Sequence, residues 1–361
     1  MILGRFRWRR LTVIALRLGL IGLAAWFFLA IVTGVDWAKV GSALTELTAL
    51  QAVALLLLLI PRIVLNAYPL SRFVPGLPLR RAVPCDLNGS VLVTFAPTPS
   101  DIMLRLSMFR SWNVDVTLGV AGMVLNSVVY YTIRFAAPVI GFFLILAGPG
   151  FDSRFAAAAT VGGVIAAGLV VILVAVLRAE RVAAATGRLA GRLAHRVRPG
   201  AVDPGQWERQ MVQFRGTVEE RARAGWRRSA PAILGMLLAE SVLFLVAVRF
   251  MGVPASAISA VEVTGCFCLT YALSVLPLSG LGVLDTALAG LLVSYAGSSH
   301  SSAITAALVL WRIYTLLIPF ALGGLGVLVW WRHRDVPAPA ADDPISPQAP
   351  RHGLHPRECD D

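Results

Sequence analysis

The sequence predicts an all-α protein that crosses a membrane several times, and its composition and hydropathy pattern lead to that prediction. Hydrophobic residues make up 57% of the 361-residue chain and charged residues only 14%, whereas soluble domains carry about 25% charged residues. The apolar residues gather in blocks, many close to the roughly 20 residues that a helix needs to cross a bilayer. This composition excludes an ordinary soluble enzyme, a disordered protein and a nucleic-acid-binding domain.

The formal net charge of +12 fits the same class of protein. The arginines lie between the apolar blocks, where the positive-inside bias places them, so we expect no nucleic-acid partner. Cys266 and Cys268 are separated by one residue, unlike the two of a redox or zinc pair. No cluster of metal ligands and no nucleotide-binding or nucleophile motif stands in a suitable context. The sequence therefore predicts no catalytic residue, metal or cofactor.

Apolar stretches of spanning length predict about six full spans. Residues 1–10 form a basic start that we expect in the cytoplasm, followed by a transmembrane domain over residues 11–334. An even number of crossings also places the C-terminal end in the cytoplasm, and the Pro- and Asp-rich residues 335–361 should be disordered. The expected spans are Leu11–Val32, Leu47–Leu70, Val116–Leu146, Phe155–Leu177, Ala230–Met251 and Ala303–Trp331.

Two further apolar stretches are broken in the middle and predict helical hairpins. Residues 83–110 are interrupted at Pro97–Asp101, and residues 255–295 at Pro277–Gly282. The hairpins are either re-entrant or pairs of true crossings, because broken backbone at membrane depth must be satisfied inside protein or a wet cavity. Each follows a span and precedes a long arginine-bearing helix. Their expected insertion from opposite sides predicts an inverted repeat, a known plan of transporters.

A polar, arginine-rich insert covers residues 178–228 and predicts two cytoplasmic amphipathic helices. In the second helix the apolar residues recur at helical spacing, with charged residues on the other face. Such a hairpin rests on the bilayer or on its own protein, and a partner site is the alternative. The apolar residues of the second helix are Trp207, Met211, Phe214, Val218 and Ala222.

Ionisable residues inside the apolar blocks are the first candidates for a functional site. Each costs at least about 2.5–3.5 kcal/mol at mid-bilayer unless it is paired or hydrated. They either line a cavity with arginines and carboxylates or form structural ion pairs, and those near helix ends can snorkel to the interface. The residues concerned are Arg62, Asp101, Arg105, Arg134, Glu240, Glu262, Asp285 and Arg312.

The two breaks offer a site for an anion. A helix that restarts after each proline exposes free backbone N–H groups at the positive end of its dipole. Nearby arginines would add charge, and the abundant anion in a bilayer is a lipid phosphate. Ser100/Asp101 and Ser279/Gly280 stand where N-caps belong, and Gly280 and Gly282 would let a ligand approach the backbone. Asp101 and Asp285 either carry a coupling proton or only cap helices and pair with arginine. The expected substrate-binding residues are Arg62, Ser100, Asp101, Arg134, Ser279, Gly280, Gly282, Asp285 and Arg312.

At these residues the chain resembles the transmembrane region of lysylphosphatidylglycerol synthases, a family of flippase-like integral membrane proteins. The segment Leu276–Asp285 is similar to the family's Pro-x-Ser-Gly-Gly-x-Gly pattern and its following acidic residue, although one Gly follows Ser279 here. The other matching pieces are an arginine-bearing span followed by Pro97 and Asp101, and Arg312-Ile-Tyr314 followed by Pro319 and Gly323.

The resemblance covers roughly residues 10–333 and implies a multi-pass inner-membrane protein that moves a lipid or a lipid-linked precursor between leaflets. Only the polar tail follows Arg334, so we expect no aminoacyl-transferase domain and no lysyl transfer. The implied partners are anionic phospholipids or a polyisoprenoid-linked substrate, with a second copy of the chain or a soluble enzyme as candidate protein partners. Two alternatives stay open: an integral-membrane enzyme that acts on a lipid-linked substrate, and a membrane scaffold that recruits a soluble partner.

Overall fold

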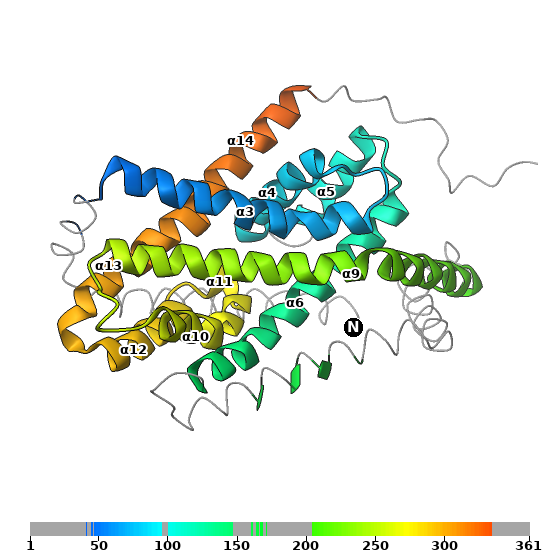
Figure 1. Ribbon diagram of the computed structural model, residues 1–361. Helices are drawn as coiled ribbons and strands as arrows, with labels where there is room; N and C mark the ends of the chain where they lie inside the picture. Colours follow the sequence, from blue (N-terminus) through cyan, green and yellow to red (C-terminus); the bar gives the residue numbers. More distant parts are fainter. Residues whose placement is uncertain are drawn as a thin grey trace, which may run out of the picture.

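The computed structural model describes residues 47–95, 100–146 and 204–333, with isolated positions at 41 and 45 and between 160 and 171. Every regular element among these residues is a helix, which confirms the all-α prediction (Figure 1). The candidate membrane spans found within them are Ala49–Phe73, Val116–Leu146, Gly216–Phe250 and Ser298–Arg332.

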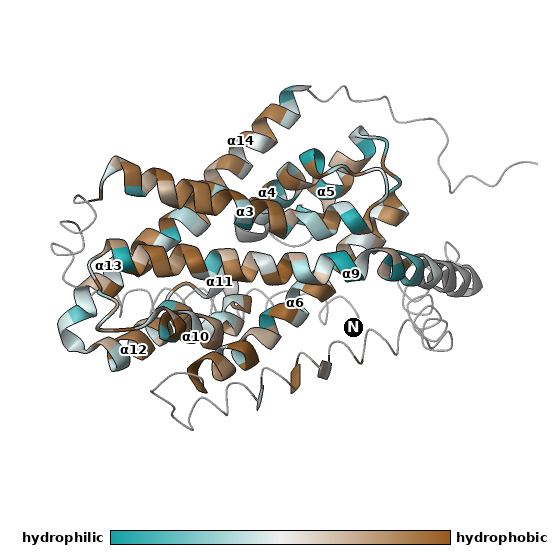
Figure 2. Ribbon diagram, viewed as in Figure 1, coloured by the Kyte–Doolittle hydropathy of each residue, from teal (hydrophilic) through white to brown (hydrophobic). Residues whose placement is uncertain are grey.

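These four helical stretches correspond to four of the expected spans. The other two, at residues 11–32 and 155–177, fall outside the described residues apart from single positions, so the expected total of six is not confirmed. The basic start, the residues of the first amphipathic helix and the C-terminal tail also fall outside them. Figure 2 shows hydrophobic residues along most of α3, α6 and α14, as membrane contact requires.

Helix α3 (Ala49–Phe73) begins at a capping box, in which Thr48 and Gln51 satisfy each other's backbone N–H groups. It packs along α9 (Pro204–Phe250), and the two helices run side by side in Figure 1. Large apolar side chains on the outer side of α3 are exposed, as on a surface that meets lipid. They are Leu50, Val53, Leu57 and Ile60.

The second predicted amphipathic helix and the following span form one helix, α9, which continues through Pro231. The sequence prediction of separate helices was therefore wrong at this junction. The apolar stripe itself is confirmed where side chains are described, because Val218 and Ala222 are buried in a cluster with Phe73 of α3. This part of the insert rests on its own protein.

The first hairpin consists of α4 (Leu79–Phe95) and α5 (Ser100–Ser111) and leads into α6 (Val116–Leu146). With 17 and 12 residues, α4 and α5 are each shorter than the roughly 20 residues of a full span. The break at residues 96–99, which includes Pro97 and Pro99, lies outside the described residues.

The second hairpin begins with α10 (Ala260–Thr270), which Ser259 and Glu262 cap, and continues into the 3₁₀ turn η1 (Tyr271–Val275). The short helix α11 (Pro277–Gly280) and helix α12 (Val283–Ala296) form its return arm. The chain then turns at η2 (Ser298–His300) and runs through α13 (Ser301–Arg312), the π-helical turn η3 (Ile313–Leu317) and α14 (Ile318–His333).

The long helix that follows each hairpin packs against the other hairpin. Helix α6, which follows the first hairpin, packs on α10 of the second hairpin, and α14, which follows the second, packs on α4 of the first. A glycine lies at each crossing: a Cβ atom on Gly141 would stand 2.6 Å from the carbonyl oxygen of Gly265, and one on Gly323 would stand 2.6 Å from that of Leu87. The close crossing of α6 on α10 accompanies the placement of Arg134 of α6 beside the break in the second hairpin, where it contacts Ser274.

Candidate functional site

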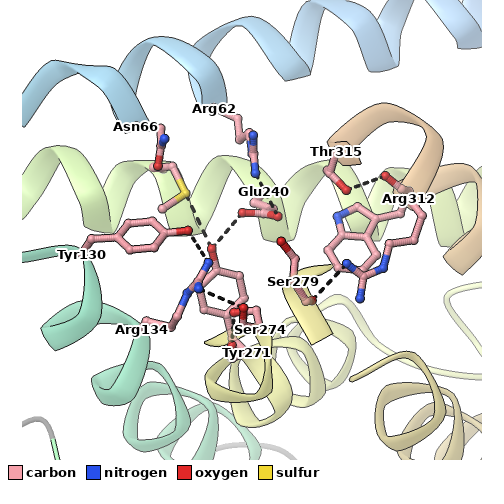
Figure 3. Close-up of polar contacts among 12 residues, drawn as sticks. Arg62, Asn66, Tyr130, Arg134, Glu240, Tyr271, Ser274, Ser279, Arg312 and Thr315 are labelled. Carbon is pink, nitrogen blue, oxygen red and sulfur yellow. Dashed lines mark hydrogen bonds and ion pairs between the residues drawn. The ribbon is translucent and has the colours of Figure 1, made fainter. Parts of the chain in front are cut away.

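The break in the second hairpin is held from two sides by the two deep arginines that the sequence singled out (Figure 3). Arg134 of α6 donates from Nη1 to the carbonyl oxygen of Ser274 at 2.9 Å. Arg312, the last residue of α13, donates from Nη1 to the carbonyl oxygen of Ser279 at 3.3 Å. The two carbonyl groups lie five positions apart, one in η1 and the other in α11. The structure therefore places both guanidinium groups at one interrupted stretch of backbone.

Arg134 is buried, with 9% of its surface exposed, and its guanidinium group lies among aromatic rings. It is 4.3 Å from the ring centroid of Tyr130 and 5.5 Å from that of Tyr271, and Nη2 donates to the Tyr130 hydroxyl. Among the described residues no carboxylate oxygen lies within 4.0 Å of its nitrogens, and Nε–H has no hydrogen-bond partner. Within the described part of the chain, Arg134 thus carries a buried positive charge without a direct counterion.

A carboxylate on α9 links Arg62 to the same cluster. Arg62 Nη2 lies 3.6 Å from Glu240 Oε1, and the Tyr271 hydroxyl donates to Glu240 Oε2 at 2.9 Å. The Glu240 side chain is only 6% exposed. Because the Tyr271 ring also faces Arg134, this carboxylate connects α3, α9, η1 and α6 in one polar network. We call Arg62, Arg134, Glu240, Tyr130 and Tyr271 the central cluster.

The second arginine has a closer partner. Arg312 Nε donates to Asp285 Oδ1 at 2.7 Å, and the other carboxylate oxygen accepts the backbone N–H of Gly282 at 2.8 Å. The guanidinium group also lies 4.4 Å from the ring centroid of Trp311. Its Nη2 is buried without a hydrogen-bond partner. Asp285 therefore acts both as a helix cap and as a counterion, and Arg312 keeps one unused donor.

The N-cap predicted at Ser279/Gly280 was wrong. Helix α12 begins at Val283 and its N-cap is Gly282, whose φ of 87° lies in the left-handed region that favours glycine. Ser279 and Gly280 belong to the preceding turn, also with positive φ, and a Cβ atom on Gly280 would stand 2.5 Å from the carbonyl oxygen of Leu273. The close approach predicted at Gly280 is therefore an approach of the chain to itself.

The first hairpin carries a separate polar cluster. Ser100 begins α5 and Asp101 lies in its first turn, as predicted for residues at a helix start. The arginine of this hairpin, Arg105, pairs with a different carboxylate, however. Asp86 of α4 lies 3.4 Å from Arg105 Nη2 and also accepts a hydrogen bond from Asn66 Nδ2 at 2.5 Å. Asp101 forms no ion pair within the part of the chain that the structure describes.

One group of the predicted site residues lies at the second break, where Arg134 also binds: Ser279, Gly282, Asp285 and Arg312. Arg62 joins this group through the central cluster.

Tyr130 and Tyr271 were not predicted from the sequence to belong to the site. Tyr130 precedes Arg134 by four positions in an apolar helix, a spacing that places both side chains on one face and could have indicated the contact. Nothing local marks Tyr271. Glu240 was recognised as ionisable but not assigned to the site.

Within the described residues no group of three or more His, Cys, Asp or Glu side chains could hold a metal ion. The fold and site instead define a multi-pass helical membrane protein with buried arginine clusters at a helix break. The chain belongs to the lysylphosphatidylglycerol synthase transmembrane-region family, whose sequence model matches residues 14–323. Comparisons with curated proteins and with solved structures gave no match. Family membership indicates a lipid-related role in the membrane.

Proposed function

We propose that this protein moves a lipid, or a lipid-linked precursor, between the leaflets of the cell membrane and binds its headgroup phosphate at Arg134 and Arg312. The buried charge of Arg134 carries the proposal. A cation at membrane depth costs at least about 2.5–3.5 kcal/mol unless it is compensated, and Arg134 has no carboxylate partner among the described residues. A phosphate oxygen would supply the missing negative charge.

The unused donors at the break also favour an anion. Arg134 Nε and Arg312 Nη2 are buried without partners among the described residues, while the Nη1 atoms of the two arginines donate to the backbone carbonyls of Ser274 and Ser279. Each arginine therefore keeps one guanidinium nitrogen that can donate a charge-assisted hydrogen bond to a phosphate oxygen. The headgroup would therefore bind between backbone and arginines while its acyl or isoprenoid chains stay in the bilayer.

The packing of each long helix against the other hairpin supports the architecture of a transporter. In an inverted repeat, related elements occupy equivalent positions from opposite sides of the membrane. The crossings of α6 on α10 and of α14 on α4, each with a glycine at the contact, are the arrangement that such a repeat would produce. We infer an inverted repeat of α3–α6 with α9–α14, in a cell membrane with both chain termini in the cytoplasm.

Leaflet exchange in reconstituted vesicles tests this function. Vesicles that contain the purified protein and a trace of headgroup-labelled anionic phospholipid should bleach completely with an impermeant quencher, whereas vesicles without protein should bleach by about half. We expect Arg134→Ala and Arg312→Ala to slow the exchange at least about tenfold, which corresponds to about 1.4 kcal/mol. Arg228→Ala, which removes an exposed arginine of α9, is the matched control.

The unfolding midpoint of each variant separates a binding defect from loss of the fold. Exchange at the wild-type rate in both site variants would contradict the proposal. An exchange rate in the Arg228→Ala control that is as low as in the two site variants would also contradict it.

A further inference from the structure

The central cluster carries a net positive charge of one. It contains the guanidinium groups of Arg62 and Arg134 and a single carboxylate, that of Glu240. Two ion pairs on neighbouring elements, Arg312 with Asp285 and Arg105 with Asp86, add no net charge. Counted over the described residues, a ligand with one negative charge therefore brings the cluster to neutrality.

Building on the proposed function, we infer that Glu240 determines which headgroup charge the site accepts, and that the site selects phosphodiester lipids with one net negative charge. Phosphomonoester lipids carry close to two negative charges above about pH 7, and zwitterionic lipids carry no net charge. Either kind leaves one charge unbalanced in a buried place, where it is costly. A diphosphate-linked precursor, with its second negative charge, is disfavoured for the same reason. This narrows the proposed substrates to anionic phospholipids.

Glu240 is placed to act on both arginines of the cluster. Its Oε1 lies 3.6 Å from Arg62 Nη2, and its Oε2 accepts a hydrogen bond at 2.9 Å from the hydroxyl of Tyr271, whose ring faces Arg134. It interacts electrostatically with each guanidinium group. Its side chain is only 6% exposed, so salt screens these interactions little. One carboxylate thus offsets half of the positive charge that the two arginines bring.

The other carboxylates near the site have arginines of their own. Asp285 Oδ1 accepts from Arg312 Nε at 2.7 Å, and its second oxygen accepts the backbone N–H of Gly282. Asp86 lies 3.4 Å from Arg105 Nη2, although it also acts electrostatically on Arg62. Asp86 is therefore the competing carboxylate that a test must include.

Binding of three short-chain lipids to the detergent-solubilised full chain tests the inference. Dioctanoyl phosphatidylglycerol, phosphatidic acid and phosphatidylcholine have the same acyl chains and carry about one, two and no net negative charges at about pH 8. Isothermal titration calorimetry gives the dissociation constant of each. We expect the wild-type protein to bind phosphatidylglycerol at least about tenfold more tightly than either of the others.

Charge variants locate the determinant. Glu240→Gln leaves two guanidinium groups without a carboxylate, so the ratio of affinities should shift toward phosphatidic acid by at least about tenfold. The double variant Arg62→Gln/Glu240→Gln again has a net positive charge of one and should restore the wild-type order of affinities. It also removes both members of the ion pair, so neither charge is left unpaired.

Glu262→Gln is the matched control. Glutamine can form the same capping box as Glu262, so the ratio should stay at the wild-type value. Each ratio compares two lipids on one protein sample, so a fraction of inactive protein does not change it. Loss of phosphatidylglycerol binding in Arg134→Ala identifies the titrated site as the proposed one.

A wild-type preference for phosphatidic acid or phosphatidylcholine would overturn this inference. So would an unchanged ratio in Glu240→Gln, an equal shift in Glu262→Gln, a larger shift in Asp86→Asn, or a double variant that keeps the preference of Glu240→Gln. In each of these cases, lipid binding that depends on Arg134 leaves the proposed function intact. Failure of the wild-type protein to bind any of the three lipids would remove the proposed function and this inference with it.

Discussion

Gly323 of α14 lies directly against the backbone of Leu87 in α4. A Cβ atom at position 323 would stand 2.6 Å from the Leu87 carbonyl oxygen, closer than atoms can pack. Gly323→Ala must therefore separate the helices, and overpacking of this kind costs about 1–3 kcal/mol. We expect a lower unfolding midpoint in detergent. Gly324→Ala, where no atom lies within 4 Å of the added methyl group, should unfold at or above the wild-type midpoint. Equal midpoints would contradict the close crossing.

The turn at the second break should be equally sensitive at Gly280. This residue has a φ of 70°, and an added methyl group would stand 2.5 Å from the Leu273 carbonyl oxygen. Gly280→Ala should therefore destabilise the protein by at least about 1 kcal/mol from the backbone conformation alone, with the collision in addition. Gly290→Ala in α12, with open space around it, is the control. The check is the difference between their unfolding midpoints, and a Gly280 variant as stable as the Gly290 variant would refute the turn geometry.

Removing the carboxylate charge of Asp285 should be costly. Asp285→Asn keeps the size of the side chain but leaves Arg312 without its counterion, and breaking a buried pair in this way costs about 3–5 kcal/mol. The exposed pair between Arg223 and Glu219 offers the comparison, since Glu219→Gln should cost less than about 1 kcal/mol. Unfolding of the purified variants by increasing amounts of denaturing detergent measures both. Similar losses in the two variants would show that the Asp285 pair is not buried in the membrane.

The shape of the Arg134 side chain should matter as much as its charge. Its guanidinium group donates to the Tyr130 hydroxyl and to the Ser274 carbonyl oxygen at the same time. A lysine ammonium group is a single point at the end of its chain and cannot reproduce this planar fork. We expect Arg134→Lys to lose most of the exchange activity that Arg134→Ala loses, as measured by leaflet exchange in vesicles. Full activity in the lysine variant would show that only the charge is needed.

The helices could be predicted because their causes are local. A long apolar stretch must satisfy its backbone hydrogen bonds within itself, so Val116–Leu146 is a helix whatever surrounds it. The proline and the two glycines clustered within Pro277–Gly282 likewise predict a break, because together they disfavour a regular helix over that short stretch. The choice of Arg134 and Arg312 as candidate site residues likewise followed from their position in apolar sequence.

The exact cap and the partners of the arginines could not be predicted. The N-cap lies at Gly282 and not at Ser279, because the turn also packs against Leu273 in another part of the hairpin. Arg105 pairs with Asp86 across α4 and α5, although Asp101 is nearer to it along the chain. Side-chain partners depend on how helices cross, and no local pattern specifies a crossing.

By itself, the sequence determined that this chain is helical, enters the membrane repeatedly and carries arginines that need compensation there, since hydropathy and the cost of buried charge act on each segment alone. Only the tertiary structure decided that Tyr271 joins Glu240 to the surroundings of Arg134, and that both deep arginines meet one broken helix. Some of these contacts join residues more than a hundred positions apart, such as Arg134 and Ser274. Their geometry is fixed by close packing between helices, which depends on the shape of the whole assembly.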